Sequence, residues 1–554
     1  MKKLFIFLFI CLIQVSIAQT TEDIDELYAG FDSNHPAVAA VVLHKGEIIY
    51  QKAYGSVNLD HKIPATIDTK FQLGGLSKHF VAYATFLLEE RGIISLDDDI
   101  RKYVSDLPRY DDKITISHLL SQTSGFPDFW TMKNIAGWHR DDVFTQAHAM
   151  DMIKQMRPAF KPGEDYIYSN TNQLLLAEII ASASGKSFSE FLNEELFQPL
   201  DMTNTVVLDD FEQYIPNVAA SYEPTESGFK RSALNYGIVG PTNVYSSVSD
   251  LAKWELNLRN PKIGSKKMIE RLYADCNMNS GETMDPLFGR LTFAQQLYHL
   301  ERGIPNYYQT GTLGGYASSI FKFIDSEFTT IVLSSGMPYS GYLGMQTAYL
   351  YLEDEFVTPG NIDYANLKTK KLSSSQLERH TGTYWNEKSG YSRSIALKDD
   401  TLRYVRGENN ESTLLPLSKD EFQMISFGDE KITVRFSGTG VDKTMSLTIG
   451  ESASVYGMRV APFAYNSEDL KAFTGTYYCK PLSTVYEFTV EGGRLTAKNL
   501  RAGTITFNPI KEGLFESDQW FFGGIQFEEN ESRIEGFTLS LEEVPSLWFK
   551  KVSS

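Results

Sequence analysis

The first half of the chain contains short runs of β-prone residues. Residues 37–43 and 47–54 are rich in Ala, Val, Ile and Tyr, and the triplet His44-Lys45-Gly46 between them predicts a hairpin turn. Residues 329–333, which read Thr-Thr-Ile-Val-Leu, form a β-branched and apolar run that predicts a buried strand. We expect these runs to build a sheet.

A helical pattern covers residues 77–91. Its apolar positions share one stripe: Phe80, Ala84, Leu87 and Leu88. Gly92 follows directly, and glycine is typical of helix ends. The pattern therefore predicts an amphipathic helix whose first turn holds both Gly75 and Lys78.

The pattern changes after about residue 351. Pro359-Gly360 and the Lys/Ser-rich residues 368–375 indicate a linker, which we place at residues 356–373. The sequence that follows occurs twice, because LERHTGTYW at residues 377–385 recurs 93 residues later as LKAFTGTYY. Two copies at this spacing indicate the duplication of a whole domain.

Each copy continues with short alternating strands, such as residues 401–405 and 494–497, separated by turn residues. Many short strands of this kind are typical of a small antiparallel barrel or sandwich. We therefore predict two barrel-like all-β domains, at residues 374–462 and 466–554.

Composition limits the partners that the protein can have. The chain has 554 residues, enough for about three or four domains. Its formal net charge of −18 disfavours nucleic acid and anionic lipid surfaces. The nine histidines form no metal-binding pattern, and Cys276 and Cys479 fall in different predicted domains. We expect no cofactor, no metal and no disulfide, and the sequence gives no indication of the oligomeric state.

The N-terminus has the pattern of an export signal. Lys2 and Lys3 precede an apolar run at residues 4–13, and Ser16-Ile17-Ala18 places small residues where a signal peptidase cleaves. The run is short for a membrane span, and no later stretch is long enough. We predict a signal peptide at residues 1–18, a periplasmic or extracellular protein, and no stable membrane insertion.

Four blocks in the first 355 residues occur in an order that is specific in combination. They are HLLSQTSGFPD at residues 118–128, KPGEDYIYSNTN at 161–172, VYSSVSDLAKW at 244–254 and YQTGTLGGY at 308–316. Together they resemble class C β-lactamases and the related D-alanyl-D-alanine carboxypeptidases and esterases, over residues 28–355. The resemblance implies an α/β serine hydrolase domain, with an antiparallel sheet flanked by helices and a helical subdomain.

Gly75 occupies the position at which this family has its nucleophilic serine. The stretch FQLGGLSKHF at residues 71–80 matches an S-x-x-K motif without the serine. In that motif the serine and the lysine share a helix face, so that the amine can take the hydroxyl proton. Glycine has no hydroxyl group, so the resemblance implies an inactive or severely impaired homologue.

The other site residues are also identified through the resemblance. Lys78 corresponds to the general base, Tyr168 to the tyrosine that exchanges protons with it, and Asn170 to the amide that holds the lysine and a substrate carbonyl. Gln309 stands where the family has lysine or histidine, so electrostatic support is reduced. Thr310 and Gly311 are kept, on a strand whose edge would bind an extended substrate, and the N–H groups of Gly75 and Thr312 would form an oxyanion hole.

Other serines are poor replacements for the nucleophile. Ser77 lies about 100° around the helix from the required face and is expected to satisfy a free backbone group. Ser227 formally begins another S-x-x-K match in a polar stretch without the family's neighbouring residues, and Ser124 matches a structural turn.

Three functions remain open. The first is a non-catalytic protein whose pocket binds a peptide, a cell-wall fragment or a small acyl compound. The second is a working esterase, D-amino-acid peptidase or β-lactamase-like hydrolase that uses activated water or an unexpected serine. In the third, the two β-domains bind sugar, lipid or protein, and the first domain is a scaffold.

Overall fold

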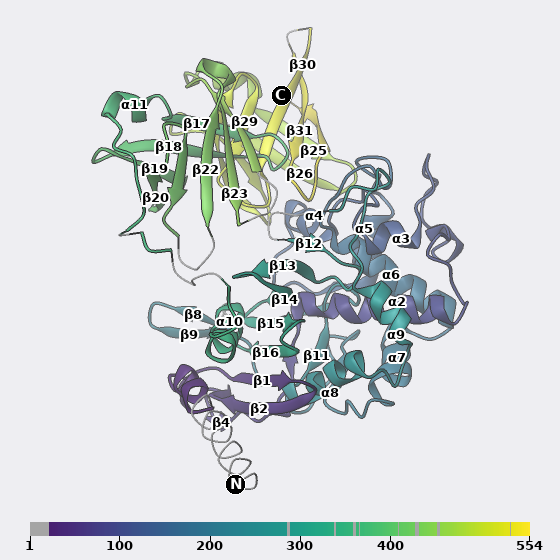
Figure 1. Ribbon diagram of the computed structural model, residues 1–554. Coiled ribbons are helices and arrows are strands. Elements are labelled where there is room, and N and C mark those ends of the chain that lie inside the picture. The colour runs from purple at the N-terminus through teal and green to yellow at the C-terminus, as the bar shows by residue number, and fades with distance from the viewer. Residues whose placement is uncertain are drawn as a thin grey trace.

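A computed structural model describes residues 21–284, 289–336, 340–357, 362–364, 366–407, 409–426, 431–450, 455–531 and 533–553. An α/β domain comes first, and two β-barrels follow and stack on one end of it (Figure 1). The predicted signal peptide at residues 1–18 and Pro359-Gly360 of the predicted linker lie outside the described residues. The domain boundaries therefore stay predictions.

The α/β domain is built on an antiparallel sheet, which in the described residues has seven strands. In spatial order the strands are β12 (Arg290–Leu291), β13 (Leu297–Glu301), β14 (Ile304–Leu313), β15 (Tyr316–Phe323), β16 (Phe328–Ser334), β1 (Val38–His44) and β2 (Glu47–Tyr54). The predicted hairpin and the predicted buried strand are confirmed as β1, β2 and β16. Lys45 and Gly46 have positive φ angles of 52° and 83°, as a tight hairpin turn requires.

Alternation along β1 divides the domain into two hydrophobic layers. Ala39 and Val41 join the cluster on the face covered by α2 (Ser77–Glu90) and α8 (Val248–Arg259). Their neighbours Ala40 and Val42 join the opposite cluster, which contains helical residues 21–28 and α10 (Ser340–Leu352). Because successive side chains of a strand point to opposite faces, a fully buried strand requires helices on both sides.

Helix α2 confirms the helix predicted at residues 77–91, with one difference at its start. Gly75 lies in a separate 3-10 turn, η1 (Gly74–Leu76), which directly precedes α2. At the other end Arg91 caps the helix and Gly92 takes a positive φ of 70°. Gly75 and Lys78 therefore still follow each other along one continuous helical path.

The remaining helices of the α/β domain form a subdomain beside the sheet and around α2 (Figure 1). They are η2 (Ile100–Lys102), α3 (Ile116–Leu120), α4 (Phe129–Ile135), α5 (Gln146–Ile153), α6 (Asn170–Ser184), α7 (Phe188–Leu192), η3 (Asn193–Phe197) and α9 (Lys266–Leu272). Short strands connect them: β3 (Ser56–Asn58), β4 (Ile63–Pro64), β5 (Phe71–Gln72), β6 (Phe144–Thr145), β7 (Val206–Val207), β8 (Tyr222–Thr225), β9 (Gly228–Arg231), β10 (Tyr236–Gly237) and β11 (Val244–Ser246). The predicted fold class of this region is confirmed.

Both predicted β-domains are closed antiparallel barrels, each with eight strands among the described residues. After α11 (Ser374–Glu378), the first barrel consists of β17 (Gly382–Asn386), β18 (Tyr391–Lys398), β19 (Thr401–Gly407), β20 (Asn410–Pro416), β21 (Glu421–Met424), β22 (Ile432–Ser437), η4 (Gly440–Asp442), β23 (Thr444–Ile449) and β24 (Val455–Val460). After η5 (Asp469–Phe473), the second consists of β25 (Gly475–Cys479), β26 (Thr484–Glu491), β27 (Arg494–Asn499), β28 (Gly503–Lys511), β29 (Leu514–Ser517), β30 (Gly524–Asn530), β31 (Arg533–Ser540) and β32 (Leu547–Ser553).

The repeated sequence has the same structural role in both barrels. The Tyr384 hydroxyl donates to the backbone oxygen of His380 at 2.8 Å, and the Tyr477 hydroxyl donates to that of Phe473 at 2.8 Å. Each bond ties the first strand of a barrel to the segment before it: Phe473 is the last residue of η5, and His380 lies two residues after the end of α11. The duplication therefore preserved a side-chain contact as well as a strand order.

The second barrel packs directly on the α/β domain. Its hydrophobic residues belong to the same cluster as the core around α2, whereas the first barrel has a cluster of its own. The Tyr486 hydroxyl donates to the backbone oxygen of Ile135 at 2.7 Å, and the N–H of Asp128 donates to the backbone oxygen of Glu543 at 2.9 Å. These contacts fix the second barrel against both ends of α4.

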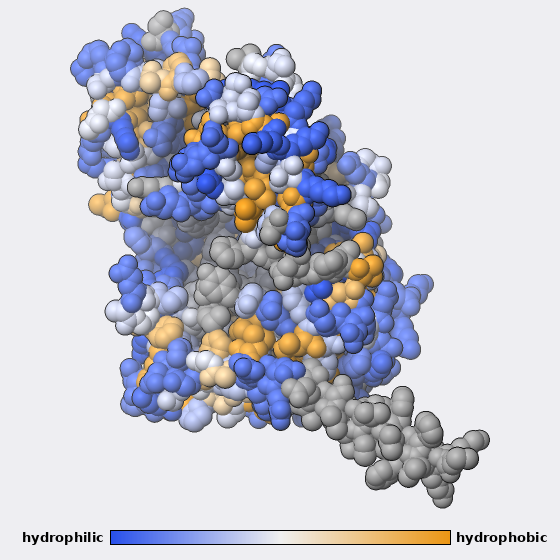
Figure 2. Space-filling model, turned by 60° about the vertical axis from the view of Figure 1, so that its left-hand side comes forward, coloured by the Kyte–Doolittle hydropathy of each residue, from blue (hydrophilic) through white to orange (hydrophobic). Residues whose placement is uncertain are grey.

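One face of the molecule is shown in Figure 2. Hydrophilic residues predominate on it, and hydrophobic residues form separate patches on the barrels and on the α/β domain. Such patches are normal on folded proteins, since polar atoms alone do not cover a protein surface. In the part of the chain that the structure describes, no helix is both long and apolar enough to cross a membrane.

Candidate active site

Gly75 and Gln309 meet where the 3-10 turn η1 lies against β14. The Gln309 side-chain Nε2 donates to the backbone oxygen of Gly75 at 2.8 Å. Thr310, Gly311 and Thr312 follow on the same strand. The residues that the sequence predicts on these two segments are therefore brought together.

The backbones of the two segments are in close contact. A Cβ on Gly311 would lie 2.3 Å from the backbone oxygen of Leu73 and 2.6 Å from the nitrogen of Gly75. Gly74 has a positive φ of 53°, and a Cβ there would lie 2.9 Å from the nitrogen of Thr312. Glycine is therefore required at 311 and 74, and the two nitrogens predicted to form an oxyanion hole belong to touching segments.

Position 75 itself has room for a side chain. A Cβ there would lie 3.3 Å from the backbone oxygen of Thr310 and 3.8 Å from the Cα of Gly311. Its φ is not in the left-handed region. A serine would therefore need a shift of a few tenths of an ångström at the Thr310 backbone, a smaller displacement than a side chain at position 74 or 311 would need.

Lys78 and Tyr168 form a direct contact. The Lys78 amine donates a hydrogen bond to the Tyr168 hydroxyl and lies 4.1 Å from the centroid of its ring. Lys78 is 3% exposed, whereas Tyr168 is 46% exposed. The pair therefore joins the buried first turn of α2 to the solvent-facing rim of the site.

Asn170 has a different partner from the one expected. Its backbone N–H and its side-chain Nδ2 both donate to Oδ1 of Asp128, at 2.6 and 2.9 Å. Among the described residues no hydrogen bond joins Asn170 to Lys78. The reason is local, because Asn170 begins α6 and its amide groups face the carboxylate that also caps α4.

Asp128 is a site residue that sequence reasoning missed. Its side chain is buried, and burial raises its pKa, while hydrogen bonds from Asn170 and the positive charge of Lys78 act in the opposite direction. The available signal was its place at the end of the 118–128 block, directly before a helix, where aspartate is a common cap.

The 118–128 and 161–172 blocks support each other. The Gln122 side-chain oxygen accepts from the backbone N–H of Ser169 at 3.0 Å and from Nδ2 of Asn172 at 2.7 Å. The Ser124 hydroxyl donates to Oδ1 of Asn172 at 2.5 Å. These bonds hold the segment before α6, and with it Tyr168, in a fixed position.

The side chain of Gln309 also faces a small cavity behind the site. The cavity measures about 20 Å³, and its lining includes His79, Trp254 and Gln296. Each of these four residues has one buried polar side-chain atom without a partner among the described residues. Burial, with the positive charge of Lys322, lowers the pKa of His79 to about 3, so this imidazole is neutral. The volume is sufficient for one water molecule with several hydrogen-bond partners.

Ser77 is turned away from the Lys78 contact. Its hydroxyl is fully buried and accepts from the backbone N–H of Val244 at 3.2 Å. The side chain thus satisfies a backbone group, as expected from its place in the first helical turn. This bond connects α2 to β11, in the third sequence block.

The second barrel also reaches this region, which the sequence did not indicate. The backbone oxygen of Glu543 accepts from Asp128, the residue that holds Asn170. Burial raises the pKa of the Glu543 carboxyl, and the negative charges of Asp128 and Glu542 add to the increase. A loop of the second barrel is therefore part of the wall beside the site.

Comparison with known proteins gives a family match over the α/β domain. Residues 18–352 match the family described as Beta-lactamase. A penicillin-binding protein of Bacillus subtilis (strain 168) is 27% identical over 430 residues, which is 74% of this chain and 89% of that protein. A D-aminopeptidase of Gluconobacter oxydans (strain 621H) is 24% identical over 351 residues, 63% of this chain and 64% of that protein.

A solved structure supports the fold. The octameric penicillin-binding protein homologue from Pyrococcus abyssi has a TM-score of 0.55 and 22% identity, covering 80% of this chain and all of that one. The family match extends over more than half of the chain and contains every candidate site residue of the first domain. The chain therefore belongs to the Beta-lactamase family.

Proposed function

We propose that this protein is an exported homologue of the serine hydrolases of its family that binds an acylated D-peptide or cell-wall fragment without forming an acyl-enzyme. The observation that carries the proposal is the contact between Lys78 and Tyr168 beside a glycine at position 75. The proton-transfer pair is present, and the group from which it would take a proton is not. Export is supported by the N-terminal pattern.

The large fall in turnover that follows removal of a nucleophile favours binding over slow hydrolysis. Removal of the nucleophile from a serine protease lowers turnover about a million-fold. What remains comes from the oxyanion hole and from substrate binding, and it is negligible for most substrates. A protein that keeps these parts therefore retains recognition while it loses acylation.

The shape of β14 supports an extended ligand. Strand β13 pairs with β14 only up to Tyr308, so among the described residues 309–313 of β14 have a strand partner on one side only, β15. An extended peptide or acyl chain can add to such an edge through main-chain hydrogen bonds. The D-aminopeptidase and the penicillin-binding protein among the relatives support a ligand that contains D-amino acids.

Titration with N-acetyl-D-alanyl-D-alanine tests the proposal. Calorimetry on the mature chain should show saturable binding, and mass spectrometry should detect no D-alanine release above the buffer control. Tyr168→Phe should weaken binding, since the hydroxyl is lost from the rim, while Tyr214→Phe, at an 83% exposed tyrosine, should not. Turnover of the peptide, or binding that is insensitive to Tyr168→Phe, would contradict the proposal.

A second candidate function is hydrolysis by a water molecule bound at position 75. The absence of a side chain at that position and the adjacent Lys78–Tyr168 contact favour it. It predicts release of D-alanine that disappears in Lys78→Met and never passes through a covalent intermediate. The same titration therefore separates the two functions.

A further inference from the structure

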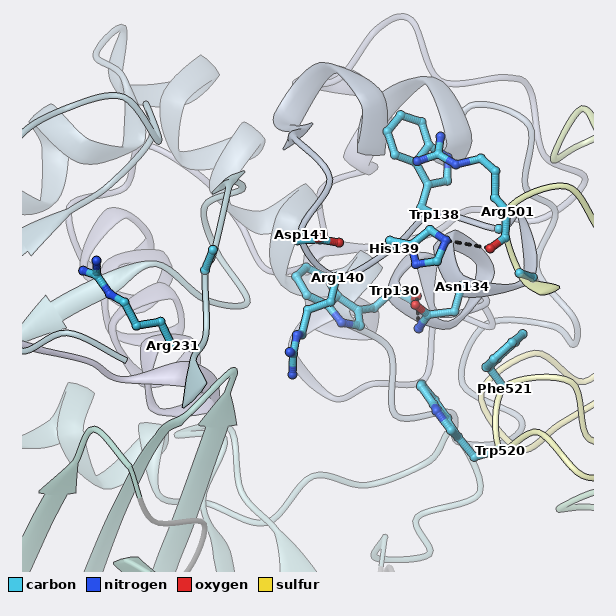
Figure 3. A pocket seen from close by; sticks show the side chains of 13 residues that line it. Trp130, Asn134, Trp138, His139, Arg140, Asp141, Arg231, Arg501, Trp520 and Phe521 are labelled. Atoms are coloured by element: carbon cyan, nitrogen blue, oxygen red, sulfur yellow. Dashed lines mark hydrogen bonds between the residues drawn. The ribbon is translucent and has the colours of Figure 1, made fainter. Parts of the chain in front are cut away.

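The second barrel meets the rest of the chain on two surfaces. One is its contact with the α/β domain, where its loops around Arg501 and Trp520 border a cavity of about 640 Å³ (Figure 3). There His139 Nε2 donates to the backbone oxygen of Arg501 at 2.6 Å, a bond drawn in Figure 3. The other surface receives the first barrel. A third surface, formed by the outer faces of β25, β26 and β32, remains exposed.

The first barrel docks through the outer face of its first strand. Trp385 on β17 is 8% exposed and packs in one hydrophobic cluster with Ile510 and Leu514 of the second barrel. Its indole lies against Gly524, because a Cβ on that glycine would lie 2.6 Å from Cη2 of Trp385. The strand face around Trp385 is therefore an interface between two barrels.

The duplicated sequence places Tyr478 of the second barrel at the position of Trp385 in the first. The two residues are 93 positions apart, as the repeats are, and each directly follows an inward-facing tyrosine, Tyr384 or Tyr477. Trp385 is covered by a neighbouring barrel, whereas Tyr478 is 36% exposed. The second barrel thus has the strand face that the first barrel uses for docking, and no segment of the described chain covers it.

Apolar side chains extend this face on both sides of Tyr478. Val485, opposite Tyr478 on β26, is 45% exposed. On the other side Lys550 lies opposite Tyr478, and Trp548, two residues before it on β32, is 38% exposed. The Trp548 indole lies against Gly536 of β31, where a Cβ would lie 2.4 Å from its Cζ2. Alternate residues of a strand share a face, so Tyr478, Val485 and Trp548 form one exposed surface, which we call the β25 patch.

Two charged residues beside the β25 patch fit a second copy of the chain. Lys550 lies opposite Tyr478 on β32, and Glu487 lies opposite Thr476 on β26, so β25 separates them. Both are exposed, and among the described residues neither side chain has an ion-pair or hydrogen-bond partner. A two-fold axis beside Tyr478 can place Lys550 of one copy against Glu487 of the other, because an isologous contact repeats each pair twice.

We propose that the β25 patch is a dimer interface, and that it is covered by the same patch of a second copy of this chain. An apolar centre with charged residues at its edge is the usual composition of such an interface. The net charge of −18 disfavours an anionic lipid surface as the occupant. None of the candidate active-site residues lies on the patch, so the inference does not depend on what the active site binds.

Analytical ultracentrifugation of the mature full chain tests the proposal. At about 50 μM the wild type should sediment with twice the mass of one chain. Val485→Glu should raise the dimer Kd about tenfold or more, because it places a carboxylate in the apolar centre of the interface. Ile425→Glu is the matched control, since Ile425 is a 37% exposed residue of the first barrel, outside the patch. It should leave the dimer unchanged.

Charge exchange distinguishes this interface from any other on the molecule. Lys550→Glu and Glu487→Lys should each weaken the dimer severalfold, because each places like charges across the two-fold axis. The double variant Lys550→Glu/Glu487→Lys should restore wild-type association, and circular dichroism of every variant should match the wild type. A wild type with the mass of a single chain, equal effects of Val485→Glu and Ile425→Glu, or no recovery in the double variant would overturn the proposal.

Discussion

The two halves of the candidate active site differ in what holds them together. In one half, Lys78 still contacts Tyr168, and Asn170 is held by a buried carboxylate. In the other half, Gly75 has no hydroxyl, and the Gln309 side-chain amide donates to the Gly75 backbone oxygen. The first half is held by side chains and the second mainly by backbone contacts.

This difference explains how the site can keep its geometry without a hydroxyl group at position 75. Lys78 is positioned by the packing of α2, and Tyr168 by the bonds that Gln122 makes to the segment before α6. Neither depends on a side chain at position 75. The backbone contact between η1 and β14 depends on Gly74 and Gly311 instead. Each half therefore keeps its geometry independently.

The largest expected effect comes from restoring the hydroxyl. In Gly75→Ser we expect hydrolysis of p-nitrophenyl acetate to rise by about 10³-fold or more over the wild type, because the new hydroxyl lies on the path to Lys78. Adding Lys78→Met to this variant should remove the gain. Gly75→Ala, which adds a side chain without a hydroxyl, is the matched control. Equal activity of the alanine and serine variants would show that Lys78 and Tyr168 cannot activate a nucleophile at position 75.

The next prediction tests the half of the site that is held by backbone contacts between η1 and β14. Gly311→Ala should lower the free energy of unfolding by about 1–3 kcal/mol, because its Cβ would overlap Leu73 and Gly75. Gly407→Ala in the first barrel, where a Cβ meets nothing within 4 Å, is the control. Chemical denaturation compares them. Equal stability of the two variants would mean that the contact between η1 and β14 is loose.

Substitutions at Gly74 and Gly75 should give a smaller difference in stability. Gly74→Ala should destabilise by about 1 kcal/mol or more, since it combines a left-handed φ with a close contact. Gly75→Ala should change stability by less than about 1 kcal/mol, because the preference of alanine for helical backbone offsets a single 3.3 Å contact of its Cβ with the Thr310 oxygen. Similar losses in both variants would contradict the conclusion that position 75 can accept a side chain.

The smallest effect concerns the barrel loop beside Asp128. Because the folded protein raises the pKa of Glu543, it holds the proton more tightly than the unfolded chain does. Stability should therefore be greatest below the ordinary carboxyl range and fall as the pH rises through the folded pKa. Glu543→Gln should stabilise by up to about 1 kcal/mol at pH 8 and have no effect at pH 3, as measured by thermal melting.

Glu529→Gln is the control for this prediction, since Glu529 is exposed on β30, on the same barrel. Glu529→Gln should change the melting temperature by the same small amount at pH 8 and at pH 3. If Glu543→Gln behaved like Glu529→Gln, the carboxyl group would not be part of the wall beside the site.

Sequence patterns predicted the local elements well where one signal dominated. The alternation in β1 and β16, the stripe of α2 and the duplicated barrel sequence each depend on neighbours along the chain. Predictions that depend only on neighbouring residues need no knowledge of the tertiary structure.

Contacts between distant segments could not be predicted in the same way. The bond from Asn170 to Asp128 joins residues 42 positions apart, and the contact of Asp128 with Glu543 joins two domains. No periodic pattern in the sequence predicts that either pair of residues is in contact. The 3-10 turn at Gly75 was also missed, since it depends on how closely β14 approaches.

Covalent labelling with a fluorophosphonate probe, read by intact-protein mass spectrometry, tests the central claim most directly. The account predicts that the wild type gains no mass, and that Gly75→Ser gains one probe adduct, which peptide mapping places at residue 75. The double variant Gly75→Ser/Lys78→Met should lose the adduct. An adduct on any serine of the α/β domain in the wild type would contradict the account.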